Sequence, residues 1–129
     1  MSYASYKNIG RDLNAPPPES LNPVIKIQSN QHRSDIINNN DITVVDNYTE
    51  WCGPCKQIAP QYSILSQKYQ GRCALVVEDV DDEIEGAMEI RGVPCFHFYV
   101  RGKFMPTLTI TGGDIPLVEE TLQKIMQKV

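Results

Sequence analysis

The chain has 129 residues, of which 41% are hydrophobic and 22% charged, and its formal net charge is −4 at neutral pH. This composition is ordinary for a globular protein and predicts a single domain with a core of its own. The acidic balance, without any basic cluster, excludes nucleic acid as an expected partner. No apolar stretch approaches the length of a membrane span, so no membrane partner is expected either.

The first 22 residues differ in composition from the rest of the chain. They contain three consecutive prolines and little apolar periodicity, a composition that favours an extended spacer. We therefore expect a flexible, proline-rich N-terminal extension over residues 1–22 and a folded domain over residues 23–129. The alternative for the extension is a docking arm. Its candidate anchors are Tyr3, Tyr6 and Leu13.

The first half of the domain alternates strand and helix patterns. Val24–Gln28 and Ile42–Tyr48 are rich in β-branched residues and predict strands, the second one buried and central. His32–Asn38 is expected to form a short helix between them. A long helix follows, because apolar residues recur every three or four positions, and Gly71 suits its end. Its buried face comprises Cys55, Ile58, Tyr62, Leu65 and Tyr69.

The second half begins with a predicted buried strand at Cys73–Val80 and a weaker helix at Glu83–Ile90. Cys95–Val100 and Phe104–Ile110 are two β patterns joined by a short turn, which predicts an antiparallel hairpin.

A last helix is expected over Ile115–Lys128, with Asp114 placed to cap it. The residues predicted to face inward are Leu117, Val118, Leu122, Ile125 and Val129. The alternation of strands and helices along the chain predicts an α/β fold, with a central mixed sheet and helices on both faces.

The most informative stretch is Trp51–Lys56, which reads WCGPCK. Residues three apart on a helix have Cβ atoms roughly 5–6 Å apart, only slightly more than a disulfide needs. Cys52 and Cys55 can therefore open and close a disulfide with little backbone movement. Pro54 suits the first turn of a helix, so Cys52 is expected at the helix N-terminus, where free N–H groups stabilise a thiolate.

Two alternatives for this pair are an inert buried pair and half of a zinc site. A structural zinc ion needs four ligands, commonly two closely spaced pairs. Cys73 and Cys95 lie on separate predicted strands, and neither has a second ligand at suitable spacing. No metal is therefore expected. No signal-peptide core precedes the domain, and four cysteines do not make a disulfide scaffold, so we expect a reducing compartment, the cytoplasm.

Four features in this order resemble the thioredoxin family, over about Val24–Val129. They are the WCGPCK motif, an aspartate six residues before its first cysteine, the segment Ile90–Pro94, and the glycine turn Thr111–Gly113. The resemblance implies the thioredoxin fold: a central mixed sheet flanked by helices.

The resemblance also implies roles for individual residues. Cys52 is expected to be the nucleophile and Cys55 the resolving thiol. Asp46 lies in an apolar strand, where burial would raise its pKa and let it accept a proton from Cys55; an exposed aspartate at a strand end is the alternative. Pro94 is expected to follow a cis peptide bond. The expected docking surface comprises Trp51, Gly53, Pro54, Val93 and Gly112, with core packing as the alternative for the tryptophan.

Several positions depart from the family pattern. Cys95 stands where threonine is common. It is either a small buried residue or a thiol near the active pair that forms a side disulfide or regulates cycling. Asn47 replaces an aromatic residue, which would make the site more polar or indicate a partner. His97 is expected at a surface-facing strand position, and Pro106 is expected on an edge strand.

These observations predict a thioredoxin-like protein-disulfide oxidoreductase that reduces disulfides of other proteins. The resemblance implies no bound cofactor beyond the redox-active disulfide Cys52–Cys55, and an NADPH-dependent flavoprotein reductase as electron donor. The alternatives are a thioredoxin-fold interaction or packaging module, and a disulfide oxidase or isomerase. Gly53 and Pro54 favour the reducing activity, since isomerases of the family more often carry a histidine between the cysteines.

Overall fold

The computed structural model describes residues 24–82 and 90–129. The predicted extension over residues 1–22 and nearly all of the predicted helix at Glu83–Ile90 lie outside the described residues. The elements in chain order are β1 (Ile25–Lys26), α2 (Asn30–Asn39), β2 (Ile42–Tyr48), α3 (Gly53–Lys68), β3 (Ala74–Asp79), a 3-10 turn η3 (Val80–Asp82), β4 (Cys95–Val100), β5 (Lys103–Phe104), a second 3-10 turn η5 (Pro106–Leu108), β6 (Ile110–Thr111) and α4 (Ile115–Lys128).

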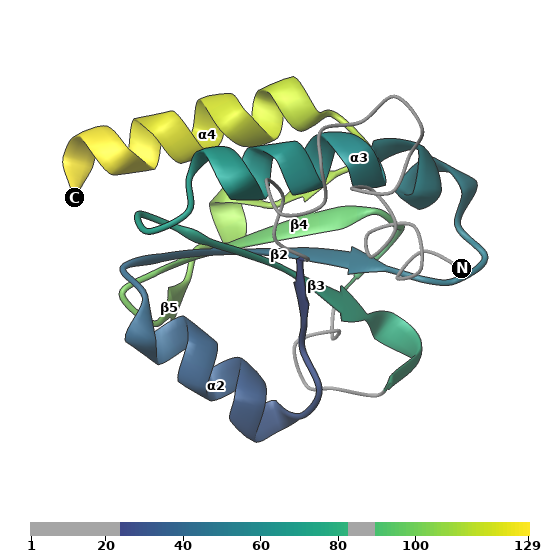
Figure 1. Ribbon diagram of the computed structural model, residues 1–129, viewed down its shortest axis with the longest axis horizontal. Coiled ribbons are helices and arrows are strands. Elements are labelled where there is room, and N and C mark those ends of the chain that lie inside the picture. The colour runs from purple at the N-terminus through teal and green to yellow at the C-terminus, as the bar shows by residue number, and fades with distance from the viewer. Residues whose placement is uncertain (1–23, 83–89) are drawn as a thin grey trace.

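Strand β2 is at the centre of the sheet. It pairs in parallel with β3 and antiparallel with β4, while β1 extends the sheet beyond β3, and β5 and β6 both pair with β4. Helices α3 and α4 cover one face of the sheet and α2 lies on the other (Figure 1). The predicted α/β class, a mixed sheet with helices on both faces, is confirmed.

The two faces of the sheet carry different cores. Successive residues of a strand point to opposite faces, so Val44 and Tyr48 pack towards α3 and α4, whereas Val45 packs towards α2. Tyr62 of α3 is fully buried, and its hydroxyl donates to the carbonyl of Val76 at 2.8 Å and to that of Val44 at 3.1 Å. This side chain therefore ties α3 to both β2 and β3.

Several predicted elements match the structure closely. Strand β2 and helix α4 have the predicted bounds, and the Asp114 carboxylate caps α4 by accepting the N–H of Leu117 at 3.1 Å. The predicted inner face of α3 is buried throughout. Gly71, just beyond this helix, has a φ of +88°, in the left-handed region that glycine adopts without strain.

The second strand of the predicted hairpin is wrong as a continuous strand. After the two residues of β5, Pro106 opens the turn η5, and β6 resumes only at Ile110. Proline has no N–H to donate to a ladder, so the strand is interrupted there. Leu117 on α4 and Val129 just after it are 40% and 44% exposed, so the prediction that they face inward is also wrong.

Candidate functional site

The two motif cysteines form a disulfide at the start of α3. Their Cα atoms are 5.2 Å apart, and Cys52 is the N-cap residue of the helix. The Cys52 sulfur accepts the backbone N–H of Cys55 at 3.0 Å. Cys52 is 8% exposed to solvent, whereas Cys55 is fully buried. The structure therefore confirms the predicted position of the pair at a helix N-terminus, with its second member the more deeply buried.

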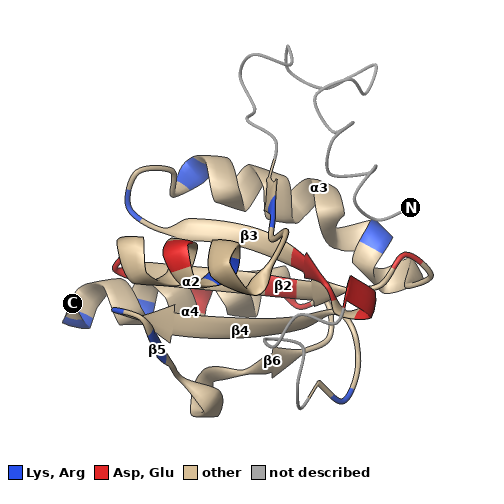
Figure 2. Ribbon diagram, turned by 90° about the horizontal axis from the view of Figure 1, so that it is seen from below, with Lys and Arg blue, Asp and Glu red and all other residues tan. Residues whose placement is uncertain are grey.

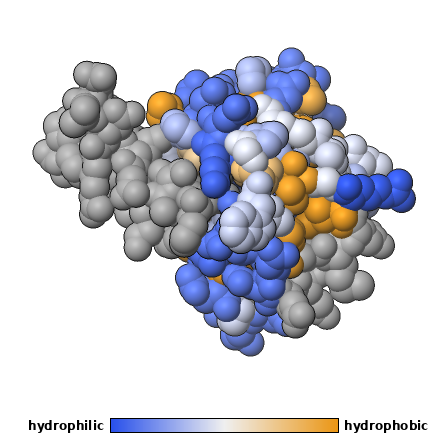
Figure 3. Space-filling view, turned by 90° about the vertical axis from the view of Figure 1, so that its right-hand side faces the viewer, coloured by the Kyte–Doolittle hydropathy of each residue, from blue (hydrophilic) through white to orange (hydrophobic). Residues whose placement is uncertain are grey.

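The surface around the pair is partly apolar. Trp51 is 87% exposed, so the alternative of core packing for this residue is wrong, and Gly53 and Pro54 are exposed beside it. Figure 3 shows the end of the molecule at which β2 ends and α3 begins. Hydrophobic residues gather near the middle of this face, with hydrophilic residues around them. Such a surface suits contact with another protein chain.

The segment before β4 lies next to the turn that precedes α4. The Val93–Pro94 peptide bond is cis, as predicted. The carbonyl of Pro94 accepts the N–H of Gly112 at 2.8 Å, and Gly112 has a φ of +108°. Val93 packs against the core cluster that contains both motif cysteines. Two of the predicted docking residues, Val93 and Gly112, are thus joined through Pro94.

Gly113 enters the sequence pattern only as part of the glycine turn Thr111–Gly113, and the space around it is tighter than that around Gly112. A Cβ atom at this position would lie 2.9 Å from Cγ2 of Ile58 on α3 and 3.9 Å from Cγ of Pro94. A real Cβ contact is essentially never that short, so a side chain here would push the turn away from α3. Only the close packing of three segments distant in sequence reveals this requirement.

Asp46 is fully buried in the middle of the sheet, so the alternative of an exposed strand-end aspartate is wrong. Its register partners on the neighbouring strands are Val77 and Phe96, both apolar. It shares a strand face with Val44 and Tyr48, which pack in the same cluster as Cys52 and Cys55. The carboxylate acts on its surroundings electrostatically: the pKa of Tyr62 is raised first by burial and further by Asp46.

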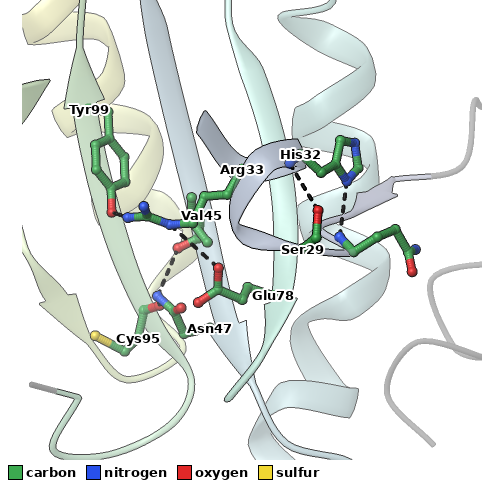
Figure 4. Close-up of polar contacts among 9 residues, drawn as sticks. Ser29, His32, Arg33, Val45, Asn47, Glu78, Cys95 and Tyr99 are labelled. Carbon is green, nitrogen blue, oxygen red and sulfur yellow. Dashed lines mark hydrogen bonds and ion pairs between the residues drawn. The ribbon is translucent and has the colours of Figure 1, made fainter. Parts of the chain in front are cut away.

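Asn47 points to the opposite face and is also fully buried. Its side-chain amide donates to the main-chain carbonyl of Cys95 at 2.9 Å and to that of Val45 at 3.4 Å (Figure 4). This side chain therefore braces β2 against β4, and it does not make the exposed surface of the site more polar.

Cys95 is buried on that same face of the sheet. Alternation along β4 places it opposite to Phe96, whose ring packs in the cluster of the two motif cysteines. Its sulfur accepts the Thr111 hydroxyl at 3.9 Å. Burial raises the pKa of the Cys95 thiol, which disfavours the reactive thiolate. These features favour the small buried residue over the regulatory thiol.

A buried polar cluster under α2 escaped the sequence reasoning. Arg33 of α2 lies with its Nε 3.6 Å from a carboxylate oxygen of Glu78, and it also donates a short hydrogen bond to the hydroxyl of Tyr99 (Figure 4). Burial raises the pKa of Glu78 to about 7, although Arg33 counteracts the shift. Glu78 and Tyr99 lie in segments that the sequence already predicts as strands, but the sequence of a strand covered on both faces does not show which of its polar residues pack against a helix.

His97 belongs to the same face and is 5% exposed, so the predicted surface-facing position is wrong. Its ring packs edge to face against Phe104, with 4.9 Å between the ring centroids. Strand β4 is paired along both edges, and its residues Cys95–Tyr99 are all buried. Both of its faces are therefore covered, which leaves no exposed side for a histidine.

Residues 24–82 and 90–129, the part of the chain that the structure describes, show no sign of a metal site or a membrane span. This part of the chain has no group of three or more histidine, cysteine or acidic side chains placed to hold a metal ion. The same part has no helix long and apolar enough to cross a bilayer. Cys73 is buried, and burial raises the pKa of its thiol.

Comparison with known proteins agrees with this geometry. Residues 23–128 match the family model for thioredoxin. The chain is 38% identical to Thioredoxin 1 of Plasmodium falciparum over 104 residues, which cover 78% of this chain and 97% of the relative. The solved structure of Plasmodium falciparum thioredoxin superposes with a TM-score of 0.70 at 31% identity and covers 78% of this chain and 98% of its own. Mitochondrial thioredoxin 3 of Saccharomyces cerevisiae, in its oxidised form, reaches a TM-score of 0.71 at 25% identity, with 96% and 99% coverage. The predicted fold is thereby confirmed, and the chain belongs to the thioredoxin family of thiol–disulfide oxidoreductases.

Proposed function

We propose that this protein reduces disulfides in other proteins through Cys52 and Cys55. One observation carries the proposal: Cys52 caps the N-terminus of α3 beside the exposed Trp51, while Cys55 is fully buried one turn further on. The helix N-terminus stabilises a thiolate at Cys52, and only this sulfur of the pair can meet a substrate.

The reaction proceeds in two exchange steps. The Cys52 thiolate attacks one sulfur of the substrate disulfide, which forms a mixed disulfide and releases the other substrate sulfur as a thiolate. The Cys55 thiolate then attacks the Cys52 sulfur, closes the Cys52–Cys55 disulfide and releases the second substrate thiolate. The substrate gains two electrons and, once its thiolates take up protons, two protons; the protein becomes oxidised by two electrons.

Asp46 is proposed to take the proton from Cys55 before the second step. Its carboxylate is buried on the strand face that packs with both cysteines, and its register neighbours Val77 and Phe96 are apolar. An ionised carboxylate in an apolar, desolvated site is a stronger base than one in water, because taking up a proton removes its buried charge. The transfer is proposed to run directly or through one water molecule.

The substrate chain is proposed to lie along the segment at Val93 and Pro94. An extended peptide adds to exposed backbone groups as an extra strand, and apolar neighbours provide contact area. Val93 is half-buried against the cluster that contains the cysteines, and Trp51, Gly53 and Pro54 are exposed next to the pair in the chain. Gly112, whose N–H donates a hydrogen bond to the carbonyl of Pro94, completes this docking surface.

The cycle requires a reductant, and we propose an NADPH-dependent flavoprotein reductase as its source. We further propose that residues 23–129 form the catalytic domain, that residues 1–22 form an extension outside it, and that the protein operates in a reducing compartment such as the cytoplasm. No cofactor other than the Cys52–Cys55 disulfide takes part in the proposed cycle.

The test is a reductase-coupled assay of insulin disulfide reduction. The wild-type chain should reduce insulin, Cys52→Ser should abolish activity, and Cys55→Ser should accumulate a mixed disulfide that gel electrophoresis without reductant detects. Cys73→Ser is the matched control, because it removes a buried thiol outside the pair and should retain activity. Activity that persists in Cys52→Ser would refute the proposal.

The direction of the reaction needs a separate measurement. Some relatives are disulfide isomerases: the chain is 31% identical to Protein disulfide isomerase-like 2-3 of rice over 107 residues, which are 24% of that protein. The reduction potential of thioredoxin is about −270 mV, and that of protein disulfide isomerase is about −180 mV. Equilibration of the Cys52–Cys55 pair with a reference thioredoxin should give a value near the former. A value near the latter would favour an oxidase or isomerase, and an inactive pair would favour an interaction module.

A further inference from the structure

A groove lies at the end of the molecule opposite the active pair. It has a volume of about 470 Å³ and runs between the turn η5 and the C-terminal half of α4. Val100, which lines it, is the register partner of Ile42 at the start of β2, whereas Asp46 and the motif lie towards the end of that strand. The groove is therefore distinct from the surface around Trp51 and takes no part in the exchange reaction.

The floor of the groove is apolar. Ile125 is buried at its base, Leu108 and Val100 are partly buried against the main core, and Val129 remains 44% exposed at its edge. A volume in this range accommodates several side chains of a ligand. The floor offers the contact area that an amphipathic partner needs.

The rim of the groove is cationic. Arg101, Lys124 and Lys128 line it, and none of the described residues that line it has an acidic side chain. Lys124 has an ion pair with Glu120 at 3.5 Å, but both side chains are mostly exposed, and such pairs contribute little. Lys124 therefore remains available to an incoming carboxylate.

This rim contrasts with the acidic character of the whole chain, which has a net charge of −4. Figure 2 shows basic residues at the end of α4 and beside β5, and acidic residues at the end of β3 on the other side of the molecule. A negatively charged partner is attracted to the groove and repelled from the acidic end.

We propose that this groove binds an acidic amphipathic segment of a partner protein, in which apolar side chains alternate with aspartate or glutamate. The apolar side chains lie on the floor, and the carboxylates pair with the rim. The three cations come from two elements, the turn after β4 and the last turns of α4, so together they can pair with several carboxylates spaced along a chain. A partner held here leaves Cys52 open to substrate.

The probe is a short cysteine-free peptide that alternates Leu and Phe with Asp and Glu, labelled for fluorescence anisotropy and titrated with the full, disulfide-bonded chain. Binding should weaken as salt rises. In spectra of the ¹⁵N-labelled protein, resonance shifts should centre on Leu108, Lys124 and Ile125. A matched peptide with Asn and Gln in place of the acidic residues should bind at least about tenfold more weakly, since several ion pairs are lost.

The double variant Lys124→Gln with Lys128→Gln should bind the acidic peptide about tenfold more weakly and keep full insulin reduction. The control is Lys56→Gln with Arg72→Gln, which removes the same charge from exposed positions outside the groove and should change affinity less than about twofold.

Four results would overturn the proposal: no peptide binding, equal binding of the neutral peptide, equal weakening in the control pair, or shifts centred on Trp51 and Val93. Binding to vesicles of anionic lipid without binding to the peptide would overturn it as well, in favour of a membrane surface.

Discussion

The side-chain amide of Asn47 on β2 donates a hydrogen bond to the main-chain carbonyl of Cys95 on β4, over 2.9 Å. The two residues are also register partners, so this bond adds a side-chain tie where the strands already pair. Both residues are buried, and Cys95 directly follows Pro94. The position of the proposed docking segment thus depends in part on a polar contact beneath the sheet.

Asn47→Ala should lower the free energy of unfolding by about 1–3 kcal/mol, because it leaves a buried carbonyl with one hydrogen bond fewer and removes packed atoms. Urea unfolding followed by circular dichroism measures the change. Asn39→Ala, at an exposed position near the end of α2, should stay within about 0.5 kcal/mol of the wild-type value. Equal losses in the two variants would contradict a bracing role for Asn47.

Stability should fall between about pH 4.5 and pH 7 because of Glu78. Its pKa is raised from 4.5 to about 7 in the folded protein, mainly by burial. Below pH 4.5 the carboxyl is protonated in both the folded and unfolded states, so it does not make the free energy of unfolding depend on pH. As pH rises towards 7, only the unfolded chain gains by ionisation, so the free energy of unfolding declines, by a contribution on the order of 3 kcal/mol, and then levels off.

The comparison that isolates this contribution is Glu78→Gln, measured by urea unfolding from pH 4 to pH 8. The difference between wild type and variant should shift in favour of the variant as pH rises through this window. Asn39→Ala, at an exposed position near the end of α2, removes no titratable group and should give a difference that does not vary with pH over the same window. A pH-independent difference for Glu78→Gln would rule out the buried carboxyl as the source.

Asp46→Asn should slow resolution of the mixed disulfide by about a hundredfold, because the amide cannot accept the proton of Cys55. Attack by Cys52, measured by its alkylation rate with iodoacetamide, should change far less. Stopped-flow detection of released substrate thiol measures the slow step. Asp41→Asn, which changes an exposed aspartate just before the start of the same strand, should leave both rates unchanged. Equal slowing of both steps would place Asp46 in a structural role.

Trp51→Ala should leave the free energy of unfolding within about 0.5 kcal/mol of wild type, since the side chain is 87% exposed. The apparent KM for insulin should rise about tenfold, in line with the loss of one aromatic contact at an interface. Ile64→Ala removes an apolar side chain that is 56% exposed on α3 and should not alter KM. A tryptophan variant with unchanged KM would remove this residue from the docking surface.

Much of the fold was predictable because local signals and burial agree. Strand β2 has seven consecutive buried residues, most of them β-branched, and α4 combines a capping aspartate with a clear apolar face. The active pair was predictable because its chemistry depends on a spacing of three residues, which the sequence displays directly.

The remaining features depend on contacts between segments that are distant in the sequence. Periodicity could not show that His97 is buried, because β4 is covered on both faces. The ion pair of Arg33 with Glu78 joins α2 to β3, and the space around Gly113 depends on Ile58 of α3. Each of these required knowledge of which elements pack together, which no local pattern contains.

The disulfide between Cys52 and Cys55 spans only three positions along the chain. A ring this small removes less freedom from the unfolded polypeptide than a bond that joins distant segments does. Opening it should therefore lower the free energy of unfolding by only about 2 kcal/mol in the loop-entropy relation, less than the loss of a long-range disulfide would. The chain can thus store and release an electron pair repeatedly while its architecture stays assembled.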